Sequence, residues 1–141
     1  MKGLIIIFVL ICSLFLIDLS SAEIIFHCAV ISRNVKLFKM AQRLNPFVSE
    51  YAYEEYRLTG DVDSLLHAMA LEPTKAAYHM YYGLALLQRR PRTLSSDKEA
   101  VKEICKAARL KPYSPVYRLA CEKYKTAIQI PEDISEAKSN K

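Results

Sequence analysis

The chain has few glycines and none of the short motifs that mark common active sites. Three glycines occur among 141 residues, which leaves no glycine-rich loop able to cradle a phosphate. The patterns G-x-S-x-G and H-E-x-x-H are absent, and the three histidines, His27, His67 and His79, lie near no nucleophile motif. Asp61 and Asp63 fit helix caps better than an acid–base pair. We therefore expect no catalytic residue and no enzyme activity.

Cysteine occurs four times, but in no metal-binding pattern. There is no C-x-x-C and no Cys/His spacing, so we expect neither a metal site nor a cofactor. Cys105 and Cys121 lie eight residues to either side of Tyr113, within a predicted helix hairpin. Two interpretations remain open: a disulfide formed in an oxidising compartment, or two small apolar residues in the core.

The N-terminus is a long apolar segment. Residues 4–17 are apolar apart from Ser13, follow Lys2, and lead into the small residues Ser20 and Ala22. This is typical of an export signal cleaved near Ala22. The alternative is an uncleaved membrane anchor in either orientation, because the apolar pattern resumes up to residue 31 and residues 4–31 could then associate with a membrane. We expect an exported protein, periplasmic or extracellular, that is either soluble or anchored.

An internal repeat organises the rest of the chain. The pattern A-x-x-L-x-P-x-x-x-x-Y occurs at residues 41–51, 68–78 and 107–117. The alanine allows two helices to approach closely, and the proline cannot continue a helix because it lacks the amide donor. The tyrosine then falls one turn into the next helix, where its ring can pack while its hydroxyl stays in water. We expect the repeat to mark the junction between successive helix pairs.

Helical patterns occupy the stretches between these junctions, and no convincing strand pattern is present. The predicted helices run over residues 47–58 before Gly60, from a cap at Asp61 to Leu71, over 75–88, from a capping box at Ser96–Glu99 to Leu110, and from Ser114–Pro115 to about Ile128. The sequence thus predicts an all-α fold, a short α-solenoid of antiparallel helix pairs. Its divisions are a signal or anchor at 1–22, a repeat domain at 23–130 and a polar tail at 131–141.

The middle copy resembles a tetratricopeptide repeat. Residues 73–85 match the family's first helix with Gly83 at its small position, and the second-helix core positions fall on Ala100, Ile104 and Ala107. The spacing departs from the family period of 34 residues, because Pro46 to Pro73 is 27 and Pro73 to Pro112 is 39. A weaker resemblance, carried by the apolar N-terminus, Leu-Asn-Pro-Phe and Ala-Ala-Tyr-His, is to repeats that follow bacterial O-antigen ligase-type membrane proteins.

The resemblance to tetratricopeptide repeats implies a concave surface, formed by the first helices, that binds a protein or peptide. Placed on the repeat, this groove would contain Tyr53, Arg57, Met80, Leu84, Leu87, Leu119 and Lys123. An apolar floor with cations at its rim suits a peptide that carries acidic residues. The alternative is that the apolar members of the groove are covered by neighbouring helices.

The net charge of +5 leaves several classes of partner open. The densest basic run, residues 89–92, is followed by cations at helical spacing from Lys98 to Lys111. These cations form either a solvated helix face or a contact for an acidic partner, anionic lipid or nucleic acid, of which nucleic acid is the least expected. The main prediction is a non-catalytic adaptor. The alternatives are a structural subunit of an envelope or membrane assembly, which would form homo- or hetero-oligomers by stacking its repeats, and a binder of acidic polymers or anionic lipid surfaces.

Overall fold

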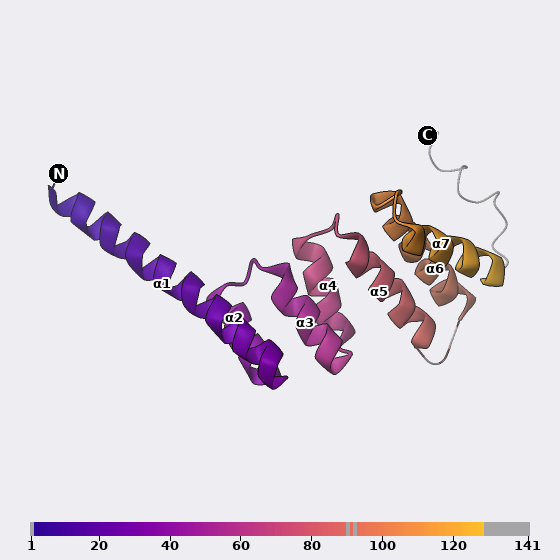
Figure 1. Ribbon diagram of the computed structural model, residues 1–141, viewed down its shortest axis with the longest axis horizontal. Coiled ribbons are helices and arrows are strands. Elements are labelled where there is room, and N and C mark those ends of the chain that lie inside the picture. Colours follow the sequence, from indigo (N-terminus) through magenta and orange to yellow (C-terminus); the bar gives the residue numbers. More distant parts are fainter. Residues whose placement is uncertain (1, 90, 92, 129–141) are drawn as a thin grey trace. The chain divides into compact units, whose positions relative to one another are not determined.

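The protein is all-helical. The computed structural model describes residues 2–89, 91 and 93–128, and these contain seven helices and no strand (Figure 1). The helices are α1 (Lys2–Ser32), α2 (Val35–Leu44), α3 (Ser49–Thr59), α4 (Val62–Leu71), α5 (Ala76–Gln88), α6 (Leu94–Leu110) and α7 (Pro115–Ile128). The chain divides into two compact units, Met1–Pro73 and Thr74–Lys141. The all-α prediction is confirmed, and the polar tail predicted at 131–141 lies outside the described residues.

The three copies of the repeated pattern have the same local structure. α2, α4 and α6 each end at the leucine of the pattern, at Leu44, Leu71 and Leu110. The residue after that leucine donates its N–H to the carbonyl of the pattern's alanine, at 2.9 Å for Ala41, 3.0 Å for Ala68 and 3.1 Å for Ala107. All three alanines are fully buried. The pattern therefore closes one helix against a neighbour that its small side chain allows to come close.

The tyrosine of the pattern is the third residue of the helix that follows, at Tyr51 in α3, Tyr78 in α5 and Tyr117 in α7. Tyr51 and Tyr78 are each only 1% exposed, and Tyr117 is half-buried. The expectation that the hydroxyl stays in water is wrong for Tyr51. Its hydroxyl is buried and finds no hydrogen-bond partner among the described residues.

The first unit begins with α1, which runs without a break from Lys2 to Ser32. Arg33 has a positive φ of 51°, and the Asn34 N–H bonds the Ala29 carbonyl at 3.2 Å, so the helix ends in a Schellman turn. α2 then packs along the C-terminal part of α1 (Figure 1), where the rings of Phe26 and Phe38 meet edge to face at 5.9 Å. None of the helices within the described residues has both the length and the apolar character needed to cross a membrane.

The C-terminal part of α1 belongs to the core of the first unit. Phe26 also lies 4.6 Å from Tyr51 of α3, measured between ring centroids. Ala22 is fully buried in the same cluster, beside Ala41 and Tyr51. The boundary expected at 22/23 from the sequence thus falls inside a helix and next to the core, and α1 pairs with α2 ahead of the pairs that the repeat predicts.

The second unit is built on the pair α5 and α6. Gly83 of α5 lies against α6 so closely that a Cβ atom there would come within 2.7 Å of the Ala100 carbonyl oxygen and 2.6 Å of Ile104 Cγ1. The predicted capping box at Ser96–Glu99 is wrong. The box is formed by Thr93 and Ser96, each of whose side chains bonds the other's backbone N–H, and α6 therefore begins three residues earlier than predicted, at Leu94.

Candidate interaction surfaces

A hollow of about 300 Å³ lies between α5 and α7 in the second unit. It is lined by Leu84, Leu87 and Gln88 from α5 and by Tyr124, Ala127 and Ile128 from α7. Each lining residue of α7 comes 40 positions after a lining residue of α5, as 124 follows 84. Since the two sets advance together, α5 and α7 run in the same direction, as the first helices of successive pairs do in a helical repeat.

The walls of this hollow are mainly apolar. On α7, Leu119 is 59% exposed and Val116 is 64% exposed. The exposed Lys123 places its Nζ atom 5.8 Å from the centre of the Tyr124 ring, a cation–π distance. The residues from Thr74 to Lys141 include fourteen lysines and arginines against seven acidic residues. The hollow has room for an apolar group, and Lys123 lies beside it.

The structure brings together part of the predicted groove. Leu84 and Leu87 line the hollow, and the half-buried Met80 lies one turn before Leu84 on α5. Leu119 and Lys123 are exposed on α7. These five residues belong to the second unit.

The other two groove residues, Tyr53 and Arg57, are on α3 in the first unit, where Arg57 bonds Glu54 at 2.8 Å. Gln88, Tyr124, Ala127 and Ile128 were missed, although the 39-residue step from Pro73 to Pro112 already relates positions near 85 to positions near 124.

The outer face of α7 differs from the matching face of α5. Counting from Tyr78 and Tyr117, the buried His79, Gly83 and Leu86 of α5 correspond to Arg118, Glu122 and Lys125 of α7. On α5 these positions face α6, because His79 bonds Glu103 and Gly83 contacts Ile104. On α7 all three are exposed and charged. A further helix could not pack on this face of α7 in the way that α6 packs on α5.

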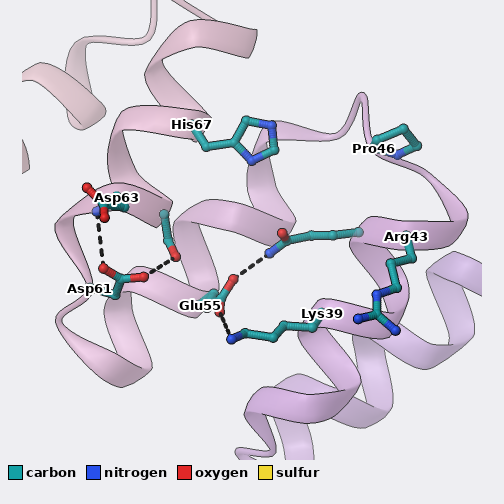
Figure 2. A pocket seen from close by; sticks show the side chains of 9 residues that line it. Lys39, Arg43, Pro46, Glu55, Asp61, Asp63 and His67 are labelled. Carbon is teal, nitrogen blue, oxygen red and sulfur yellow. Dashed lines mark hydrogen bonds and ion pairs between the residues drawn. The ribbon is translucent and has the colours of Figure 1, made fainter.

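A second hollow, of about 550 Å³, lies in the first unit between α2, α4 and the C-terminal half of α3 (Figure 2). Its lining is polar and carries both signs of charge: Lys39, Gln42, Arg43, Pro46, Glu55, Asp61, Asp63, Ser64 and His67. Figure 2 shows the basic residues along α2 and the two aspartates at the start of α4. Asp61 caps α4 as the sequence predicts, because its carboxylate accepts the Asp63 N–H at 3.2 Å and the Ser64 hydroxyl at 3.0 Å.

Glu55 forms the floor of this second hollow, with a side chain only 7% exposed. Its carboxylate accepts a hydrogen bond from Gln42 Nε2 at 2.7 Å and lies 3.8 Å from Lys39 Nζ. Both partners come from α2, so the buried charge is compensated by the helix beside it. This arrangement holds α2 to α3 and does not resemble an acid–base pair.

Two further contacts join helices in the second unit. The imidazole of His79, 2% exposed, lies 2.6 Å from Glu103 Oε2 and connects α5 to α6. Cys105 and Cys121 form a disulfide between α6 and α7, with their Cα atoms 4.7 Å apart. Among the described residues no three His, Cys, Asp or Glu side chains gather in a way that could hold a metal ion. Comparison with protein-family models and with curated proteins finds no match for this chain.

Proposed function

We propose that this protein is a non-catalytic binding module, a short helical repeat of the tetratricopeptide type. In this proposal the hollow between α5 and α7 receives an apolar side chain from a partner protein, and acidic residues beside that side chain meet the cations of the second unit. The observation that carries the proposal is the apolar hollow between two parallel helices in the more basic half of the chain.

The repeated junctions support this reading. Three copies of one pattern end three helices in the same way and start the next helices at the same distance, so that α3, α5 and α7 are equivalent elements. Helical repeats expose the surfaces of such equivalent first helices and use them for binding. The lining of the hollow comes from two of these helices.

The alternative, a structural subunit that stacks end to end through α7, has less support. Stacking would need an outer face on α7 that can take another helix. Arg118, Glu122 and Lys125 occupy that face instead.

Binding of short acidic peptides tests the proposal. The probe is fluorescein-labelled Glu-Asp-Leu-Phe-Asp-Glu, followed by fluorescence anisotropy, and the reference peptides replace Leu-Phe by Gly-Gly or the acidic residues by lysine. We expect binding only when apolar and acidic residues are both present. Leu84→Glu and Leu87→Glu should weaken binding at least tenfold, because each would bury a charge in the hollow. Leu94→Glu is the matched control, since Leu94 is 63% exposed on α6.

The outcomes separate the candidate functions. Equal binding by the two hollow variants and by Leu94→Glu would contradict the proposed site, provided that circular dichroism shows the variants to be folded. If the Gly-Gly peptide binds and its affinity falls as the salt concentration rises, the acidic-polymer function is favoured instead. Interactions between exposed charges are screened over about 10 Å at 0.1 M salt.

We also propose that the protein acts in an exported or membrane-tethered setting. The apolar segment at residues 4–17 and the small residues before Glu23 motivate this, and the disulfide agrees with an oxidising compartment. Intact mass and N-terminal sequencing of the native protein, with separation of soluble and membrane fractions, would test it. A full-length chain found only in the cytoplasm would contradict it.

A further inference from the structure

We propose that the Cys105–Cys121 disulfide controls the hollow between α5 and α7, so that reduction of the bond releases α7 and weakens binding. This inference rests on the proposed function, because it concerns the same hollow. It makes the protein a binding module whose affinity depends on the redox state of its surroundings.

The first reason is the small contribution of packing to the position of α7. None of the residues of α7 is buried, whereas α5 has five buried residues. Its contacts with the rest of the unit come from half-buried side chains such as Tyr117, Tyr124 and Ile128. Because burial of apolar area is the main noncovalent stabilisation of a helix on its neighbours, α7 is held weakly by packing alone.

The second reason is the place of the bond. Cys121 is one turn before Tyr124 on α7, and Cys105 lies near the middle of α6, next to the buried Ile104. The disulfide thus ties α7 to α6, which has four buried residues and packs closely against α5 at Gly83. Three of the six residues that line the hollow come from α7, so the hollow exists only while α7 stays in place.

The third reason is chemical access. Neither cysteine is fully buried, and a thiolate reaches the bond as α7 moves away from α6. A dithiol reductant attacks one sulfur and forms a mixed disulfide, and its second thiol then displaces the protein cysteine. Two electrons and two protons pass to the protein, Cys105 and Cys121 become thiols, and the reductant becomes a disulfide.

The test compares oxidised protein, protein reduced with dithiothreitol, and the Cys105→Ser/Cys121→Ser variant. All three carry Cys12→Ser and Cys28→Ser, because the free Cys28 is exposed and could exchange with the disulfide. Two quantities are measured: the Kd for Glu-Asp-Leu-Phe-Asp-Glu, and amide hydrogen exchange in α7 relative to α5. We expect at least tenfold weaker binding and at least tenfold faster exchange in α7 for the reduced protein and for the variant.

The two readouts separate this inference from the proposed function. Equal exchange in α7 with and without the disulfide would overturn the inference, whatever the peptide does. If the reduced protein shows faster exchange in α7 but the same Kd as the oxidised protein, the disulfide does not control binding and the inference is overturned. If the oxidised protein binds no peptide, the proposed function fails. The exchange rates of α7 with and without the disulfide then still show whether the bond holds this helix in place. Dithiothreitol must leave the serine variant unchanged, or the observed effect does not come from this bond.

Discussion

At the scale of single residues, Gly83 determines how closely α5 and α6 approach each other. A Cβ atom at this position would lie 2.7 Å from the backbone carbonyl of Ala100, which cannot move aside as a flexible side chain could. We expect Gly83→Ala to lower the free energy of unfolding by about 1–3 kcal/mol, because the overpacking exceeds the roughly 1 kcal/mol that alanine gains in helix propensity.

Urea unfolding followed by circular dichroism would measure the effect of Gly83→Ala. Adding Ile104→Val should relieve little of the loss, since the contact with the carbonyl remains. A Gly83→Ala protein as stable as the wild type would show that the two helices are not as close as the structure has them.

Tyr51 places a polar atom in the core without a hydrogen-bond partner among the described residues. We expect Tyr51→Phe to leave the free energy of unfolding unchanged or to raise it by about 1 kcal/mol, because an unpaired buried hydroxyl is costly. Tyr113→Phe is the control, since Tyr113 is 99% exposed. Thermal or urea unfolding would show the difference, and a clear loss of stability in Tyr51→Phe would mean that the hydroxyl is bonded after all.

The same residue predicts a pH dependence. Burial, together with the carboxylates of Glu23 and Glu50, raises the pKa of Tyr51 above its usual value of 10.0. The folded state therefore holds the phenol proton more tightly than the unfolded state. The stability that results is fully present below pH 10, the usual pKa of tyrosine, and is lost as the pH rises through the higher pKa of the folded state. Between pH 9 and 11 the wild type should lose more stability than Tyr51→Phe does.

At the scale of elements, the C-terminal part of α1 packs against both of the helices that follow it. Phe26 contacts Phe38 of α2 and Tyr51 of α3. We expect Phe26→Ala to destabilise the protein by about 2–4 kcal/mol, somewhat below the range for fully buried phenylalanine because Phe26 is half-buried. Ile24→Ala on the same helix is the control, since Ile24 is 65% exposed and its truncation should cost less than about 0.5 kcal/mol.

Urea unfolding of the Phe26→Ala and Ile24→Ala variants would decide whether this segment belongs to the folded unit. Equal stability of the two variants would indicate that residues 23–32 do not contribute to the core of the first unit.

At the scale of the whole molecule, charge is distributed unevenly between the halves of the chain. Residues 1–73 contain six lysines and arginines against eight acidic residues, whereas the remainder contains fourteen against seven. Within the second half, Lys98, Lys102 and Arg109 are exposed on α6. Such a field would attract an acidic partner before contact.

We expect the double variant Lys98→Glu/Lys102→Glu to bind the acidic peptide about three- to tenfold more slowly at low salt. The difference should vanish at 1 M salt, where screening acts over about 3 Å. Arg33→Glu/Lys36→Glu in the first unit makes the same change in net charge and should slow association less. Stopped-flow anisotropy measures these rates, and equal rates for both variants would rule out steering by the second unit.

The sequence by itself predicted α3 to α7 and most of their ends. Alanine, leucine, proline and tyrosine at fixed spacing act through local geometry, so the three junctions, the Gly60 stop and the Asp61 cap could be predicted. The capping box was misplaced by three residues because Ser96–Glu99 has the usual pattern of serine followed by glutamate, whereas the box in the structure uses Ser96 in place of the glutamate.

The features that only the tertiary structure decided are contacts between residues distant in sequence. Whether residues 22–29 join the core, whether the Tyr51 hydroxyl reaches water, and whether Leu84 meets Tyr124 are all set by how helices pack. Buried area and close contacts arise between elements, and a sequence pattern records only which face of each element is apolar. The repeat therefore determines where α2, α4 and α6 end, while packing determines which side chains form a hollow.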